Sequence, residues 1–313
     1  MRFLYFVVIL LVGFSIPAHS FPVEIENCGI KQTYTAPPQR AVAHDKNISE
    51  IMFALGLRER MVGLSGITGW YKMTPDFEAL MGDLPELAPK YPSLENLLAV
   101  DPDFFFAGWY YGMRPGGEVT PDVLQTFDIN TYVLTESCAH TGQQIPATMD
   151  TLYTDVRNIG RIFGRAELAQ SLIDSWRARI DAITDRTNDA TPRRVFVYDS
   201  GEDKPFTAGK YAMPHALIEA AGGEHVTGDV DMSWGTVSWE SVITQDPELI
   251  ILVDYSETGW AERWAYISAM PGMQHVAAIR NQRYLVLDYT EITPGPRNIV
   301  AVEKLAQALY GPL

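Results

Sequence analysis

Large aromatic residues are the side chains of this sequence whose positions most clearly indicate a chemistry, and that chemistry is binding. Trp109 and Tyr110 follow the apolar run 104–106, and Tyr255 follows the run 249–253. In parallel α/β sheets ligands bind outside the carboxyl ends of the strands, so aromatic residues there are expected to face a cleft. Aromatic rings bind flat or hydrophobic ligands and lose little rotamer entropy. The predicted ligand-binding set also includes Trp70, Tyr71, Tyr91, Trp234 and Tyr289.

Three histidines are weaker candidates, as ligands of a divalent metal ion. His44 stands at the end of the first predicted strand of the main sheet, and with His140, His215 and an acid it would form a site shared by two parts of the chain. Their spacing is not diagnostic, so no resident metal is predicted and bare-metal binding is an alternative. Haem is a further alternative, with Tyr71 or a histidine as axial ligand.

The sequence contains no recognised catalytic motif. It has no G-x-G-x-x-G after a predicted strand, no phosphate loop, no G-x-S-x-G and no H-E-x-x-H. We therefore expect a protein that is not an enzyme and has no cofactor of its own. Catalytic triads are assembled in space rather than in sequence, so an exported hydrolase stays as an alternative of another class. A free-standing structural or adhesion module is a third alternative.

A short block occurs twice, once in each half of the chain. One copy starts at Ser93 and the other at Ser238, and each has a glutamate two positions later, Glu95 and Glu240. Each copy then reaches an Asp-Pro pair, an acidic residue and an apolar run. Serine is a favoured N-cap, a first-turn glutamate stabilises a helix, and proline disfavours helix in the residue before it. The duplication predicts two similar lobes, each with a short helix that leads into a buried strand.

The surrounding pattern predicts an α/β protein with two Rossmann-like lobes and mostly parallel sheets. Residues 40–64 form a strand, a helix and a second strand, which is a βαβ unit. The irregular stretch 65–92 is rich in glycine and proline and has the length of a functional loop. Residues 147–190 predict one long, rigid helix between the lobes, because they lack the composition of a flexible linker. The predicted lobes are residues 21–146 and 191–313.

The N-terminus predicts export. Arg2 precedes an apolar run over residues 3–16, and small residues follow near 18–20, as in a cleavable signal peptide. The run is shorter than the roughly 20 residues needed to span a membrane, so residues 1–20 are predicted to be a signal peptide for the periplasm. The formal net charge of −15 argues against nucleic-acid binding, which requires a basic surface. We expect a monomer.

The two cysteines, Cys28 and Cys138, are predicted to form a disulfide. An even number of cysteines in an exported protein favours a bridge, whereas two unrelated buried thiols are the alternative. Such a bridge would staple the first lobe. The spacing matches no zinc site.

The order of these motifs resembles that of one family, the class III substrate-binding proteins of ABC importers, which have a helical backbone between their lobes. The resemblance covers essentially the whole mature chain. It is carried by Arg40-Ala41-Val42, Ser49-Glu50-Ile51, Ala54-Leu55-Gly56, Arg60-Met61-Val62-Gly63, the repeated Ser-x-Glu block and Pro296-Arg297. Members of this family carry ferric siderophores, haem and cobalamin. The resemblance therefore implies capture of a bulky metal chelate, either a ferric siderophore or a corrinoid, and its delivery to an ABC permease.

The resemblance also implies roles for individual residues. Glu95 and Glu240 match the glutamates that pair with arginines of the membrane subunit. Trp234, six residues before the second glutamate, is similar to a pocket tryptophan of the cobalamin binders, as is Trp109. Asp288 falls near a pocket acid of the same proteins.

Departures from the cobalamin binders leave the ligand open. The loop 67–91 is longer and differently composed, and the segment around Cys28 suggests a less characterised branch. Arg114 and Arg297 would suit the carboxylates or catecholates of a siderophore. The sequence thus predicts a chelate without deciding between a corrinoid and an iron complex.

Overall fold

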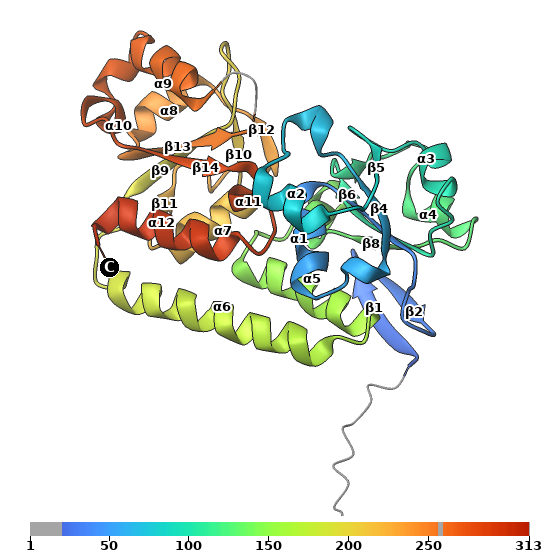
Figure 1. Cartoon of the computed structure of the whole chain (residues 1–313). Helices are drawn as coiled ribbons and strands as arrows, with labels where there is room; N and C mark the ends of the chain where they lie inside the picture. The colour runs from blue at the N-terminus through green and yellow to red at the C-terminus, as the bar shows by residue number, and fades with distance from the viewer. Residues whose placement is uncertain (1–20, 256–258, 313) are drawn as a thin grey trace, which may run out of the picture.

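A computed structural model describes residues 21–255 and 259–312 and shows two α/β lobes side by side (Figure 1). The predicted signal peptide, residues 1–20, lies outside the described residues. Within those ranges no helix is both long and apolar enough to cross a membrane. The predicted fold class, α/β with mostly parallel sheets, is confirmed.

The N-terminal lobe is built on a parallel sheet with strand order β5-β4-β3-β6-β7, and β8 pairs with β6. An antiparallel hairpin of β1 and β2 precedes the sheet. Phe104, Phe105 and Phe106 of β6 are all fully buried, as expected for a central strand covered on both faces. The strands are β1 (Val23–Asn27), β2 (Ile30–Tyr34), β3 (Ala41–His44), β4 (Met61–Ser65), β5 (Glu86–Ala88), β6 (Phe104–Trp109), β7 (Gly112–Met113) and β8 (Asn130–Val133). The helices are α1 (Lys46–Ala54), α2 (Pro75–Met81), α3 (Leu94–Leu98) and α4 (Pro121–Gln125).

The C-terminal lobe repeats this plan with a smaller parallel sheet of order β11-β9-β13-β14 and a separate antiparallel pair, β10 with β12. The strands are β9 (Arg194–Tyr198), β10 (Phe206–Ala208), β11 (Glu224–His225), β12 (Trp234–Thr236), β13 (Leu249–Asp254) and β14 (Tyr284–Asp288). The helices are α7 (Met213–Ala220), α8 (Trp239–Gln245), α9 (Trp260–Ala269), α10 (Ala277–Arg280), α11 (Tyr289–Ile292) and α12 (Asn298–Tyr310).

The segment predicted as one long helix is two helices, α5 (Met149–Ile162) and α6 (Ala166–Thr187). Gly164 has a φ of 68°, a left-handed conformation that ends α5. Gly160 lets the two helices approach closely, because a Cβ there would lie 2.4 Å from the Cβ of Ala169. With 22 residues, α6 is about 33 Å long and runs along both lobes (Figure 1).

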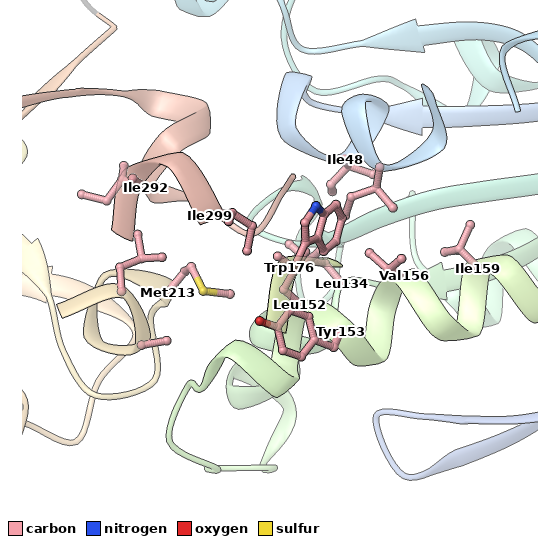
Figure 2. Packing of buried hydrophobic residues seen from close by; sticks show 14 of the residues in the cluster. Ile48, Leu134, Leu152, Tyr153, Val156, Ile159, Trp176, Met213, Ile292 and Ile299 are labelled. Carbon is pink, nitrogen blue, oxygen red and sulfur yellow. The ribbon is translucent and has the colours of Figure 1, made fainter. Parts of the chain in front are cut away.

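One hydrophobic core extends through both lobes and along this helix. Trp176 of α6 packs in the same buried cluster as Val156 of α5, Ile48 of α1, and Met213 and Ile299 of the C-terminal lobe (Figure 2). Because apolar surface from both lobes is buried in one cluster, separating the lobes would expose it to water. The shared core therefore holds the two lobes in place relative to each other and so defines the space between them.

The repeated block forms two N-capped helices, as predicted. Ser93 caps α3 by accepting a hydrogen bond from the Asn96 amide at 3.1 Å, and Ser238 caps α8 by accepting one from Ser241 at 3.1 Å. Asp101 and Asp246, which precede the prolines, both have a positive φ, 46° and 45°, and so end their helices in the same way. Glu95 and Glu240 lie exposed in the first turns of α3 and α8.

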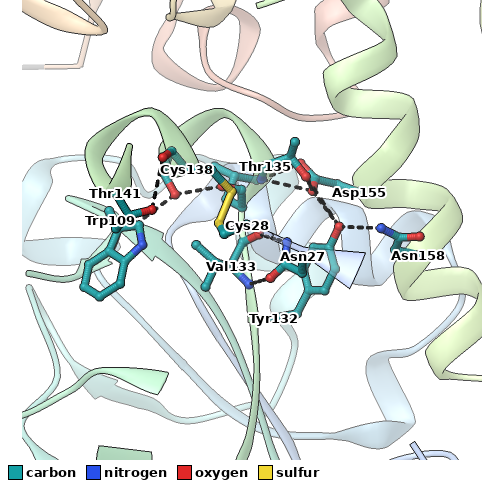
Figure 3. The surroundings of a disulfide bond; sticks show 12 residues. Asn27, Cys28, Trp109, Tyr132, Val133, Thr135, Cys138, Thr141, Asp155 and Asn158 are labelled. Carbon is teal, nitrogen blue, oxygen red and sulfur yellow. Dashed lines mark hydrogen bonds between the residues drawn. A yellow bond between two sulfur atoms is a disulfide. The ribbon is translucent and has the colours of Figure 1, made fainter. Parts of the chain in front are cut away.

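The predicted disulfide between Cys28 and Cys138 is present, with Cα atoms 5.2 Å apart (Figure 3). It joins the turn of the β1–β2 hairpin to the 3₁₀ helix Thr135–Thr141. The Asn27 side chain supports the same junction, because its amide donates to the Val133 carbonyl at 2.8 Å and its oxygen accepts from the Val133 amide at 2.7 Å.

Replacing both cysteines by serine should lower the free energy of unfolding by about 2–5 kcal/mol, because the unfolded chain regains the entropy that a large closed loop removes. Urea denaturation of the oxidised protein and of the Cys28→Ser/Cys138→Ser variant measures this. Wild-type protein unfolded in a reducing agent is the control and should match the variant. An unchanged midpoint would show that the bridge does not stabilise the fold.

Candidate ligand-binding site

A cavity of about 530 Å³ lies between the two lobes, which is within the usual size range of small-molecule sites. Most of the side chains around it are aromatic. The residues that line it are Tyr110, Tyr111 and His140 from the N-terminal lobe and Asp199, Phe206, Trp234, Val253, Tyr255, Tyr289, Ile292 and Thr293 from the C-terminal lobe. Tyr110 is 52% exposed, so the cavity is open to solvent on this side.

The N-terminal wall is set by a tight turn between β6 and β7. Gly108 and Tyr111 exchange backbone hydrogen bonds of 2.7 and 2.9 Å, and Tyr110 between them has a φ of 64°. The turn places Tyr110 at the opening, where its ring lies 4.6 Å from that of His140. Tyr111 is turned inward and only 7% exposed.

The C-terminal wall follows the rule for parallel sheets. Tyr255 directly follows β13 and Tyr289 directly follows β14, so both aromatic rings stand at the carboxyl ends of neighbouring strands, 5.4 Å apart. On the antiparallel pair, Trp234 of β12 stacks on Phe206 of β10 at 6.1 Å, with ring planes 15° apart. Such stacked and edge-to-face pairs present rigid apolar faces to a ligand.

A buried charged network holds Tyr289 from the opposite lobe. Lys72 donates to both carboxylate oxygens of Asp45 at 2.8 and 2.7 Å, and the Tyr289 hydroxyl donates to the same carboxylate at 2.8 Å. The Lys72 ammonium also lies 3.6 Å from the centre of the Tyr289 ring, a cation–π contact. Burial lowers the pKa of Lys72, and the Asp45 charge acts in the opposite direction. This network connects the two lobes through Tyr289, which lines the cavity.

Asp199 is a second buried acid at the cavity wall, directly after β9. Its carboxylate accepts hydrogen bonds from the Tyr255 hydroxyl at 3.0 Å and from the Ser200 hydroxyl at 2.7 Å. Burial raises the pKa of Asp199. Asp199 therefore fixes Tyr255 within its own lobe, as Asp45 fixes Tyr289 across the lobes.

Four predicted aromatic residues, Tyr110, Trp234, Tyr255 and Tyr289, are brought together around the cavity, and four others are not among its lining residues. Tyr91 lies just behind Tyr110 and donates from its hydroxyl to the Tyr110 carbonyl at 2.6 Å. The ring of Trp70 is covered by the Lys90 ammonium at 4.4 Å, and Tyr71 is 59% exposed. Trp109 packs partly buried against a separate core cluster of its lobe.

The predicted polar residues are also engaged outside the cavity lining. Arg297 forms ion pairs with Glu50, at 2.7 Å, and with Asp76, at 2.5 Å, both in the other lobe. Arg114 lies over the ring of Tyr91 at 4.7 Å. Asp288 caps α11, its carboxylate accepting from the Thr290 amide at 2.9 Å.

The three candidate histidines occupy three separate environments. His44 is buried, with its Nδ1 2.9 Å from the Ser65 hydroxyl, and burial lowers its pKa to about 4. His215 lies in the C-terminal lobe, where its ring is 5.6 Å from that of His225. Of the three candidate histidines, His140 alone lines the cavity. The described ranges contain no group of three or more side chains that could hold a metal ion, so the three histidines, the weaker alternative from the sequence, do not form a joint site in this part of the chain.

Sequence reasoning missed six lining residues: Tyr111, Asp199, Phe206, Val253, Ile292 and Thr293. Asp199 and Val253 stand at the carboxyl ends of strands, so the rule that identified Tyr255 also applies to them. Tyr111 is adjacent to a predicted residue. Nothing in the local pattern distinguishes Phe206, Ile292 or Thr293 from ordinary packing residues.

Two similar α/β lobes with an aromatic cavity between them define a binding protein, and comparison with known proteins identifies its family. Residues 42–290 match the family described as periplasmic binding protein, and the chain belongs to that family.

Individual relatives agree with this assignment. A cobalamin-binding protein of Halobacterium salinarum is 24% identical over 299 residues, which span 94% of this chain and 75% of that protein. Among solved structures, a periplasmic binding protein from Veillonella parvula is 27% identical with a TM-score of 0.80, covering 93% of this chain and 98% of that one. A protein of an Fe³⁺-hydroxamate transport system from Saccharomonospora viridis is 25% identical with a TM-score of 0.78, covering 93% and 99%.

Replacing Lys72 by methionine should destabilise the protein by about 3–5 kcal/mol, because the buried carboxylate of Asp45 would lose its counter-ion. Chemical denaturation measures this, with Lys90→Met, at an exposed lysine nearby, as the control. The double variant Lys72→Met/Asp45→Asn should recover part of the loss. Equal stability of Lys72→Met and Lys90→Met would contradict the network.

Proposed function

We propose that this protein is the substrate-binding protein of an ABC importer and that it captures a bulky metal chelate. A corrinoid is the first candidate for this chelate. In this proposal residues 1–20 direct the protein to the periplasm, where it acts as a monomer and delivers the chelate to a permease without covalent chemistry. The observation that carries the proposal is the cavity itself, which is walled by aromatic rings from both lobes. Membership of the periplasmic binding protein family and the cobalamin-binding relative support it.

The lining favours a corrinoid over an anionic iron siderophore. Among the described residues that line the cavity there is no lysine or arginine, and the side chain of Asp199 is the only carboxylate. Arg114 and Arg297, the candidates for binding siderophore carboxylates, are engaged elsewhere. A corrin ring with amide substituents requires flat apolar contact and neutral hydrogen-bonding groups, which tyrosine, tryptophan and a neutral histidine supply. Burial lowers the pKa of His140, which favours its neutral form. Because the cavity is open, a chelate larger than it can project into solvent.

Removing the ring of Trp234 should weaken corrinoid binding by about tenfold or more, since a buried tryptophan anchor contributes a large share of binding free energy. Isothermal titration calorimetry with cyanocobalamin, a ferric hydroxamate and hemin measures both ligand choice and affinity. Trp260→Ala, at a tryptophan that stacks on Tyr284 in the same lobe, is the matched control. Trp109→Ala should weaken corrinoid binding less than the loss of the Trp234 ring does, because Trp109 is not among the residues that line the cavity.

Two results would contradict this assignment. Tight binding of the hydroxamate or of hemin, with no binding of cyanocobalamin, would change the ligand class. Equal affinities of Trp234→Ala and Trp260→Ala would place the ligand away from the cavity.

Glu95 and Glu240 are the proposed contacts with the permease. Both are exposed first-turn residues, one in each lobe, on helices α3 and α8, which lie on the side opposite α6 (Figure 1). A membrane partner with two basic patches could therefore contact both lobes at once. The resemblance to the importers' binding proteins suggested this role from the sequence.

The variant Glu95→Ala/Glu240→Ala should lose binding to permease-containing membranes and keep its chelate affinity. Glu167→Ala/Glu262→Ala is the matched control, because these two glutamates also lie exposed in first helical turns, of α6 and α9. Co-sedimentation with membranes and uptake in cells are the measurements. Unchanged membrane binding by the first double variant would reject the docking assignment.

A further inference from the structure

Glu136 is a buried acid that joins the wall of the cavity to the opposite lobe. It lies in the 3₁₀ helix Thr135–Thr141 of the N-terminal lobe and is only 4% exposed. One of its carboxylate oxygens accepts a hydrogen bond from the Tyr111 hydroxyl at 3.0 Å. The other accepts from the backbone amide of Met213, the first residue of α7 in the C-terminal lobe, at 2.5 Å. One side chain thus holds a lining tyrosine and a helix of the other lobe.

The contacts continue from Glu136 to the far wall of the cavity. Tyr111 lines the cavity together with Trp234 of β12; burial raises the pKa of Tyr111, and Trp234 acts in the opposite direction. The Tyr111 hydroxyl donates to Glu136 as long as Glu136 is ionised, because a carboxylate only accepts. Tyr111 and Glu136 of the N-terminal lobe and Met213 of the C-terminal lobe therefore form one hydrogen-bonded network that joins the lobes.

The surroundings of Glu136 differ from those of Asp45. Asp45 has Lys72 as a counter-ion, whereas no ion pair to Glu136 is found among the described residues. The titratable groups that act on it are Tyr111, from the β6–β7 turn, and Asp155, from α5, while α7 contributes the Met213 amide. Tyr111 in turn interacts electrostatically with Asp45 and Tyr289. Burial, together with the Asp155 charge, raises the pKa of Glu136 to about 7, whereas the bonds from Met213 and Tyr111 lower it.

We propose that Glu136 is a positioning residue for ligand binding, which in its ionised form orients the lining residue Tyr111 and holds α7 against the N-terminal lobe. This inference rests on the proposed function for its ligand. Glu136 does not line the cavity and acts through Tyr111.

Protonation changes the direction of the bonds. A protonated Glu136 donates with one oxygen and is a weaker acceptor than the carboxylate. If its other oxygen keeps the Met213 amide, Glu136 donates to the Tyr111 oxygen, and the Tyr111 hydrogen must then find a new acceptor in a largely apolar cavity. An unpaired buried donor is unfavourable. Affinity should therefore be high above pH 7 and fall as the pH decreases through the pKa of Glu136.

The ligand-free test is the NMR chemical shift of the Met213 amide in the full mature protein. It should titrate with a midpoint near pH 7, the pKa of Glu136, because its acceptor changes charge. Glu136→Gln should abolish the titration. Asp155→Asn is the matched control: Asp155 is also buried with a pKa raised to about 7, yet its partners in the described part of the chain are Thr135 and Tyr132, both of its own lobe. That variant should keep the titration, with a lower midpoint.

The ligand test is calorimetry with cyanocobalamin at pH 5.5 and pH 8. Wild-type affinity should be about fivefold weaker at the lower pH, the effect of one lost hydrogen bond. Glu136→Gln, whose amide must also donate to one partner, should bind at both pH values as the wild type does at pH 5.5. Asp155→Asn should keep the pH dependence.

The two proposals fail in different ways. A Met213 amide that does not titrate in the wild type, or an Asp155→Asn variant that loses the titration, overturns the role of Glu136 whatever the ligand. A titrating amide combined with pH-independent cyanocobalamin affinity also overturns it. If cyanocobalamin binds at neither pH value, the corrinoid proposal is rejected. If the Met213 amide nevertheless titrates, the link between Glu136 and Met213 is still supported.

Discussion

The structure depends on a hydrophobic core that both lobes share. Apolar side chains of the two lobes meet along α6, where Trp176 is buried among residues that are far apart in the sequence (Figure 2). Opening the lobes widely would expose this surface, so the hydrophobic effect opposes large movements. The cavity is therefore largely formed before a ligand arrives, and its walls can be built from rigid aromatic rings. Binding a large chelate in such a site requires little ordering of side chains.

Buried carboxylates then hold the walls of the cavity in place. Asp45 binds the hydroxyl of Tyr289, Asp199 that of Tyr255, and Glu136 that of Tyr111. Tyrosine suits this arrangement, since its hydroxyl can be bonded behind the wall while its ring faces the ligand. Two of the three carboxylates connect groups of different lobes, so the orientation of the rings and the relative position of the lobes are coupled. Through this coupling, the packing of the two lobes against each other also sets the positions of the aromatic rings that line the cavity.

The sequence predicted those parts of the structure that follow from local patterns. Ser93 and Ser238 cap helices because a side-chain oxygen near a helix N-terminus satisfies its free amides, and Tyr255 and Tyr289 face the cavity because they end parallel strands. Partners from distant parts of the chain were not predictable. Arg297 was expected to bind a ligand, yet Glu50 and Asp76 of the other lobe hold it. Lys72 carries no local signal, although it lies in the long loop whose length suggested a function. The break at Gly164 was visible as a glycine between two periodic segments, but glycine within a helical pattern does not by itself specify a left-handed residue.

The most direct test of the account is the absorbance spectrum of the protein purified from the periplasm of its own cells. We predict a corrinoid spectrum that co-purifies with the protein, or that is regained with one cobalamin per chain when cobalamin is added to ligand-free protein. A Soret band of haem, the charge-transfer band of a ferric siderophore, or a colourless protein that retains no added corrinoid would contradict the assignment of the aromatic cavity.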